Sequence, residues 1–106
     1  MPHGYTYIMG SDTGVLYIGV TSELDNRISQ HKAGAFEGFS KTYGCTRLLY
    51  YELHEDIRTA IAREKQLKGW RREKKLNLIR KQNPGFNDLA EKQGWRLITR
   101  HEKMKP

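Results

Sequence analysis

Short runs of aromatic and β-branched residues, separated by turn-forming residues, mark the first half of the chain. Residues 5–9 (Tyr-Thr-Tyr-Ile-Met) and 15–20 (Val-Leu-Tyr-Ile-Gly-Val) have the composition of β-strands. The segment between them, residues 10–14, reads Gly-Ser-Asp-Thr-Gly and favours a turn. These two strands are therefore predicted to form an antiparallel hairpin, and the run from Arg47 to Leu53 to form a third strand.

The predicted hairpin brings two tyrosines onto one face of the sheet. A turn that is symmetric about Asp12 places Tyr7 directly opposite Tyr17, and the side chains of opposed residues share a face. Gly19, two residues beyond Tyr17, leaves space on that face. Taken alone, the pair is typical of aromatic packing across a hairpin. Its functional interpretation is that a tyrosine near cations loses its proton more readily and acts as a general base.

A helix is predicted to begin at a cap formed by Thr21 or Ser22 and to run to about Lys32. Arg27 and His31 are four residues apart in this segment, so their side chains lie one above the other. Each also has an ordinary interpretation, as a solvated charge and as a surface or hydrogen-bonded histidine.

A second helix is predicted from near Asp56 to Lys68, where the following glycine ends it. Glu64 falls in the middle of its apolar stripe. Burying a lone carboxylate is costly, so this side chain is expected to be paired, protonated or bound to a metal. The ordinary alternative is a salt bridge to Arg58 or Arg63, or a position at the rim of the core. The stripe itself consists of Ile57, Ala60, Ile61 and Leu67.

The rest of the chain completes a single α+β domain, residues 1–106. Residues 33–44 are glycine-rich and are predicted to be a loop. A third helix is predicted from Arg71 to Gln82, ending before Asn83-Pro84. In the C-terminal tail, residues 90–106, the stretch from Trp95 to Thr99 is compatible with a short strand or a packed tail.

The net charge of +7 and the pI near 9.7 indicate an anionic partner, and nucleic acid is the first to consider. Between Arg63 and Lys81 there are nine Lys or Arg against Glu64 and Glu73, with Trp70 interleaved. Such a run is either a surface that tracks phosphates or a merely solvated face. The residues predicted to contact nucleic acid are Lys41, Arg63, Lys68, Arg71, Arg72, Lys74 and Lys75.

Other classes of protein fit the sequence poorly. The chain has no apolar stretch approaching the ~20 residues of a membrane span. Its single cysteine, Cys45, cannot form an internal disulfide, so it is expected to be a small buried residue in a protein of the reducing cytoplasm. The sequence also lacks a C-x-x-C pair, an H-E-x-x-H zinc motif and a P-loop.

The order of these residues resembles the GIY-YIG nuclease superfamily, and its small single-domain bacterial members in particular. Tyr5-Thr6-Tyr7 stands where the family has its first triplet, and Tyr17-Ile18-Gly19 reproduces the second. Arg27 and His31, followed by Glu64, occur at the family's intervals. The resemblance covers about residues 5–89 and also includes Phe39-Ser40-Lys41, the segment from Ala62 to Lys68, and Asn83-Pro84.

Some positions depart from the family pattern. Tyr5 and Thr6 replace the Gly and Ile of the first triplet, and Val20 stands where some relatives carry a lysine. Asn87 is a further candidate, for the distal asparagine of the family. Many nucleases of this type carry a separate DNA-binding domain, and no such domain is present in these 106 residues.

The resemblance implies a fold and a mechanism. The fold is a three-stranded antiparallel sheet flanked by helices. In the mechanism, Glu64 holds one Mg²⁺ or Mn²⁺ ion that polarises the scissile phosphate of DNA. Tyr17 or Tyr7 helps to deprotonate the attacking water, with Tyr17 favoured, and His31 acts as base or proton relay. Arg27 offsets the charge that builds up on the phosphate.

Two other classes of function remain open at this point. One is a nucleic-acid-binding module that uses the same fold without catalysis, and the other is a structural or partner-binding domain. The five residues Tyr7, Tyr17, Arg27, His31 and Glu64 favour a metal-dependent DNA endonuclease, because a pure binder has little use for a centred carboxylate. Branched or damaged DNA is among the candidate substrates.

Overall fold

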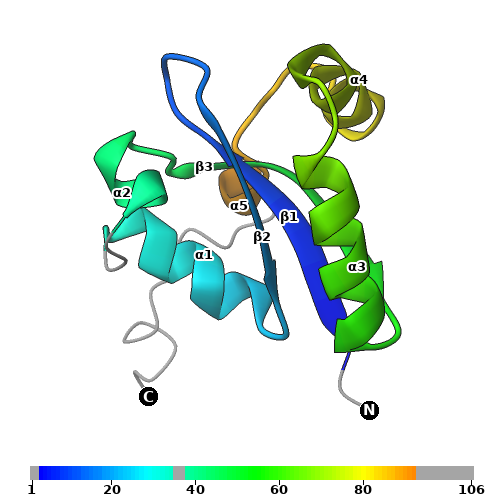
Figure 1. Cartoon of the computed structure of the whole chain (residues 1–106). Coiled ribbons are helices and arrows are strands. Elements are labelled where there is room, and N and C mark those ends of the chain that lie inside the picture. The colour runs from blue at the N-terminus through cyan, green and yellow to red at the C-terminus, as the bar shows by residue number, and fades with distance from the viewer. Residues whose placement is uncertain (1–2, 35–37, 93–106) are drawn as a thin grey trace, which may run out of the picture.

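In the computed structural model, which describes residues 3–34 and 38–92, three antiparallel strands form one sheet (Figure 1). The strands are β1 (Gly4–Gly10), β2 (Leu16–Thr21) and β3 (Arg47–His54), in the order β2-β1-β3. The predicted α+β fold with a flanked three-stranded sheet is therefore confirmed. The prediction for Trp95 to Thr99 lies outside the described residues.

The β1–β2 turn has a different centre from the predicted one. The Ser11 hydroxyl accepts hydrogen bonds from the backbone N–H of Thr13 and of Val15, and the Ser11 N–H donates to the Val15 carbonyl. The turn is thereby centred on Thr13 rather than on Asp12, and β1 pairs with β2 two residues out of the predicted alignment.

The prediction that Tyr7 lies directly opposite Tyr17 is therefore wrong. Tyr7 pairs with Gly19, and Tyr17 pairs with Met9. Because side chains alternate with a period of two, a shift of two residues keeps both tyrosines on the same face.

Five helices accompany the sheet in the described part of the chain. The helix α1 begins later than predicted, after Glu23, because Thr21 is still the last residue of β2. Residues 33–44, predicted to be a loop, include the short α2, and α5 was not predicted. The helices are α1 (Leu24–Lys32), α2 (Phe39–Thr42), α3 (Ile57–Lys68), α4 (Arg72–Gln82) and α5 (Leu89–Lys92).

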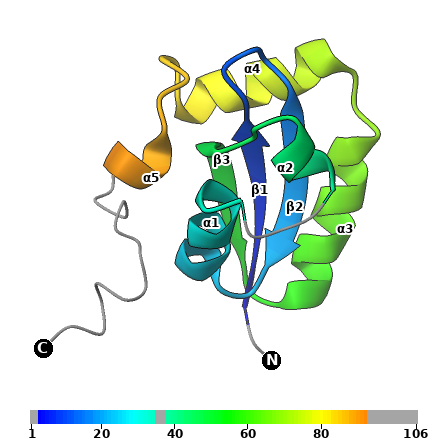
Figure 2. The same cartoon turned by 90° about the vertical axis from the view of Figure 1, so that its left-hand side faces the viewer.

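Each face of the sheet is covered by its own helices (Figures 1 and 2). Tyr7 and Met9 of β1 point to one face, where they pack with α1, α5 and the buried Cys45. Ile8 points to the other face and packs with α3 and α4. The second core consists of Ile8, Ile18, Leu49, Tyr50, Leu67 and Ile79, with Trp70 and Phe86 among the side chains at its edge.

The helix α3 lies against β1 and β2 through a narrow stripe. Ala60 and Leu67 are fully buried, and the Thr6 hydroxyl donates a 2.8 Å hydrogen bond to the Ala60 carbonyl. Ile61 was predicted to face the core but is 36% exposed, because it sits 100° around the helix from Ala60. The helix ends at Gly69, as predicted.

A polar network fills the space between β3 and α3. Tyr50, Glu52 and His54 alternate along β3 and so point toward α3. The Glu52 carboxylate accepts hydrogen bonds from Arg63 Nε at 3.0 Å and Nη2 at 2.9 Å, from the Tyr50 hydroxyl, and pairs with His54 Nε2 at 3.0 Å. Burial alone would raise the pKa of Glu52, but the hydrogen bonds from Arg63 and Tyr50 hold it below its usual value. This carboxylate therefore stays ionised in the folded protein.

We expect the Glu52 network to give the protein an acid-sensitive stability. Because the pKa of Glu52 is lower in the folded than in the unfolded state, the stabilisation is complete above pH 4.5 and is lost as the pH falls below it. Glu52→Gln should cost about 2–3 kcal/mol at pH 7 and less at pH 3. Denaturant unfolding at several pH values measures this. Glu55→Gln, at an exposed position, is the control. Equal losses for Glu52→Gln at pH 7 and pH 3 would contradict the expectation.

Candidate active site

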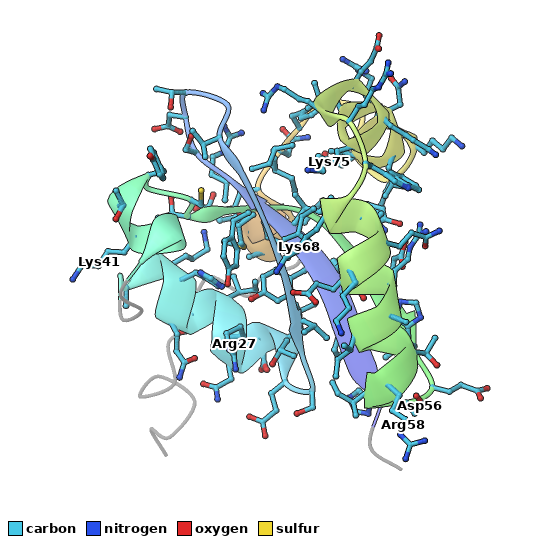
Figure 3. All side chains as sticks on the ribbon, viewed as in Figure 1. Arg27, Lys41, Asp56, Arg58, Lys68 and Lys75 are labelled. Carbon is cyan, nitrogen blue, oxygen red and sulfur yellow. The ribbon has the colours of Figure 1, made fainter. Side chains whose placement is uncertain are left out.

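The predicted site residues come from both faces of the sheet and meet near its edge strand, β2. Figures 1 and 2 show β2 between α1 and α3, which cover opposite faces. Figure 3 shows Arg27 on α1 and Lys68 on α3 on opposite sides of β2. An edge strand is where side chains from the two faces of a sheet come within reach of each other.

Three aromatic rings form the centre of the site. The hydroxyl of Tyr7 lies 2.8 Å from His31 Nε2. The ring of Tyr17 lies 5.2 Å from that of His31 and 6.5 Å from that of Tyr7, measured between centroids. Tyr7 is fully buried and His31 is 4% exposed, whereas Tyr17 is only partly buried. The structure thus brings Tyr7, Tyr17 and His31 together.

Burial determines the protonation of Tyr7 and His31. Burial raises the pKa of Tyr7, and the nearby Tyr17 and Glu64 raise it further. Arg27 lowers this pKa through its positive charge and its hydrogen bond to Tyr7, but the effect of burial is larger. Burial, together with the positive charge of Arg27, lowers the pKa of His31 to about 4. At pH 7 the Tyr7 phenol and the His31 imidazole are therefore both neutral, and a hydrogen bond joins the phenol oxygen to His31 Nε2. The expectation that nearby cations make this tyrosine easier to deprotonate is wrong for Tyr7, because desolvation dominates.

Gly19 makes room for the Tyr7 ring. A Cβ atom at Gly19 would lie 2.4 Å from the Tyr7 hydroxyl oxygen and 2.5 Å from Cζ, far inside van der Waals contact. The third residue of the second triplet is thus required by the packing of a side chain on the neighbouring strand, as the space predicted at Gly19 suggested.

Glu64 sits on the buried stripe of α3, between Ala60 and Leu67, as predicted. Its side chain is 14% exposed and pairs with Lys68 Nζ at 2.7 Å, rather than with Arg58 or Arg63. Its negative charge is one of the causes that raise the pKa of Tyr7, so the carboxylate acts on the same pocket as the aromatic rings.

Glu64 would have to bind a cation without a dense ligand cluster. Among residues 3–34 and 38–92, no three or more His, Cys, Asp or Glu side chains are close enough together to hold a metal ion. A single carboxylate does fit Mg²⁺ or Mn²⁺, which keep several waters and take further oxygens from a substrate phosphate. A structural zinc site, which needs about four protein ligands, is not present in this part of the chain.

Two other predicted site residues, Asn87 and Arg63, lie in different surroundings from the aromatic cluster. Asn87 is bound through its backbone to Asn83, which also donates to the Leu49 carbonyl of β3. Because β3 is the edge of the sheet opposite β2, Asn87 does not join the site. Arg63 is held in the Glu52 network, so its guanidinium serves the fold.

Four of the remaining predicted cations line two surface grooves that the sequence did not predict. One groove is lined by Arg71 and Lys74 beside Trp70. The other is lined by Arg72 and Lys75 beside the β1–β2 turn. Lys41 is exposed on α2 and points away from both (Figure 3). The interleaving of Trp70 with basic residues was the available signal for the first groove.

Comparison with known proteins agrees with this geometry. Residues 3–77 match the GIY-YIG catalytic domain family. The UPF0213 protein of Staphylococcus aureus strain Mu3 and UPF0213 protein SA0446 of strain N315 are each 31% identical over 80 residues, covering 76% of this chain and 98% of the relative. The solution structure of UPF0213 protein BH0048 from Bacillus halodurans has a TM-score of 0.54 and 25% identity, covering 84% of this chain and 95% of the other. Within the described residues, no helix is long and apolar enough to cross a membrane.

Substitution of Gly19 should disturb the aromatic cluster. The added methyl group of Gly19→Ala overlaps the Tyr7 ring, so we expect a loss of about 1–3 kcal/mol in unfolding free energy and a changed NMR environment at His31. Gly69→Ala is the matched control, because that Cβ would meet no atom closer than 3.5 Å. Equal stability of the two variants would show that the Tyr7 ring can move aside freely.

The protonation of His31 gives a second test. Its pKa of about 4 is below the usual 6.5, so the unfolded chain takes up a proton first as the pH falls. Stability should therefore decline between pH 6.5 and pH 4, by up to about 3 kcal/mol, and His31→Gln should lack this decline. In an NMR titration the His31 ring should stay neutral at pH 5.5. A midpoint between pH 6 and pH 7 would contradict this assignment.

Proposed function

Since this chain belongs to the GIY-YIG catalytic domain family, a family of nucleases, we propose that it is a metal-dependent DNA endonuclease. The observation that carries the proposal is the meeting of Tyr7, Tyr17 and His31 with the charge of Glu64 at one edge of the sheet. Arg27, on the same helix as His31, supplies a cation to this pocket. The reaction is hydrolysis of a phosphodiester bond, in which water attacks phosphorus and the bond to the 3′ oxygen breaks.

Glu64 would hold one divalent cation, Mg²⁺ or Mn²⁺. When bound, such an ion polarises the scissile phosphate and stabilises the leaving oxygen. Glu64 is 14% exposed, so a cation can reach it, and its partner Lys68 is 56% exposed. The lysine can therefore return to water at little cost when the carboxylate takes a different partner.

The two tyrosines have different roles in this proposal. The Tyr7 hydroxyl is hydrogen-bonded to His31 Nε2 and the Tyr7 ring is fully buried, so Tyr7 holds His31 in place. Tyr17 is partly exposed and is the phenol that contacts the attacking water. His31 is neutral at pH 7 and is able to accept a proton that leaves the water, which a protonated histidine could not do.

Positive side chains support DNA as the substrate in this proposal. Arg27 lies close to Tyr7 and offsets negative charge on the phosphate during the reaction. Along the surface, Lys68 on α3 and the cations in the first turn of α4, Arg72, Lys74 and Lys75, are available to neutralise further phosphates. The net charge of +7 favours the same partner over a neutral or cationic substrate.

Glu64→Gln is the decisive variant. The amide keeps the shape of the side chain but removes the charge that binds a hard cation, so cleavage in Mn²⁺ should fall by roughly 1,000-fold. The unfolding free energy should change by less than about 1 kcal/mol, because the partner Lys68 is largely exposed. Gel assays on linear, nicked and branched DNA, with Mn²⁺ or with a chelator, measure the first effect, and thermal melts measure the second.

The control for this experiment is Glu55→Gln, which removes one negative charge at an exposed position and should cleave like the wild type. A Glu64→Gln protein that cleaves DNA at the wild-type rate would overturn the role given to Glu64. If the wild-type protein binds DNA but cleaves none of the three substrates with either metal, the fold serves as a binding module without catalysis.

A further inference from the structure

A groove between the β1–β2 turn and the first turn of α4 has a volume of about 450 Å³. The backbone of the turn forms one wall and two cationic side chains form the other. A Cβ atom at Gly14 would lie 3.0 Å from Arg72 Nη2, so the guanidinium lies directly against the turn. Gly14 has a φ of +94°, which favours glycine here. The lining residues are Thr13, Gly14, Val15, Leu16, Arg72 and Lys75.

The charge of this groove suits an anion. Its only charged lining residues are Arg72 and Lys75, and in the described part of the chain neither forms an ion pair or a side-chain hydrogen bond. The nearby Asp12 is 93% exposed and pairs with Arg47 at 3.8 Å. The neighbouring groove beside Trp70, by contrast, contains a carboxylate, Glu73.

The groove lies beside the start of β2, the strand that leads to the candidate active site. Its last lining residue on the turn side, Leu16, is the first residue of β2, and Tyr17 is the next. In Figure 3, Lys68 on α3 and Arg27 on α1 lie on opposite sides of β2, farther from the β1–β2 turn than Lys75. The four residues from Leu16 to Gly19 span about 10 Å of extended strand, three steps of roughly 3.3 Å each.

We propose that this groove binds a backbone phosphate of the DNA strand that is cut, roughly two or three nucleotides from the scissile phosphate. The inference rests on the proposed function, because it takes the reacting phosphate to lie at Tyr17. The guanidinium of Arg72 and the ammonium of Lys75 contact the phosphate oxygens, and the edge of β2 sets the distance between the two phosphates. The groove thus fixes how the strand is positioned, without reading its sequence.

Single neutral methylphosphonate substitutions along the cut strand test this. For the wild-type protein in Mn²⁺, one position about two or three nucleotides from the cut should raise KM by roughly 10-fold, since one phosphate contact is lost. The double variant Arg72→Ala/Lys75→Ala should lose a similar factor on unmodified DNA and show no further loss at that position. This non-additivity is expected only if the two changes remove the same contact.

Two further variants serve as controls. Arg58→Ala/Lys81→Ala removes the same charges from exposed positions on α3 and α4 and should keep the wild-type pattern. The charge-preserving Arg72→Lys/Lys75→Arg should restore sensitivity to the methylphosphonate. Thermal melts establish that every variant is folded. If the sensitive position persists in Arg72→Ala/Lys75→Ala, the groove does not hold that phosphate and the proposal is overturned.

A binding measurement separates this proposal from the proposed function. With a chelator present, Arg72→Ala/Lys75→Ala should reduce the slope of log affinity against log salt by roughly two, while Arg58→Ala/Lys81→Ala leaves it unchanged. A reduced slope in a protein that cleaves no DNA would support the phosphate groove and overturn the nuclease function. Cleavage with an unchanged slope would support the nuclease function and overturn the groove.

Discussion

The hydrogen bond between the buried Tyr7 hydroxyl and His31 is the interaction on which the candidate site depends. It joins β1 to α1 across the core and fixes the orientation of both rings. Gly19 on β2 is the condition for it, because any side chain there would occupy the space of the phenol. One contact thus requires a tyrosine on one strand, a glycine on the next and a histidine on the helix that follows.

The same contact explains why two tyrosines of one site behave differently. Tyr7 is completely buried, so desolvation raises its pKa even though Arg27 is near. It keeps its proton and holds a neutral His31, whose pKa burial has lowered. Tyr17 remains partly exposed. The difference comes from depth in the fold, since the two side chains are chemically identical.

Glu52 on β3 and Glu64 on α3 are both partly buried, and their different surroundings give them contrasting roles. Glu52 receives a bidentate arginine, a tyrosine hydroxyl and a histidine, so its charge is fully compensated and stabilises the packing of α3 on β3. Glu64 pairs with Lys68, whose ammonium is largely in solvent. A carboxylate whose partner is easily exchanged is suited to take a cation, whereas one held by four donors is not.

The sequence by itself determined the strands, the three longer helices, the shared face of Tyr7 and Tyr17 and the place of Glu64 on an apolar stripe. These depend on periods of two and of 3.6 residues, which neighbouring positions set. Only the tertiary structure decided the pairing of Tyr7 with Gly19, the raised pKa of Tyr7, the partner of Arg63 and the distance of Asn87 from the site. The hairpin alignment depended on a hydroxyl in the turn, and the others on burial and pairing among residues far apart in the chain. A local pattern contains no information on which distant group removes water from a side chain or compensates its charge.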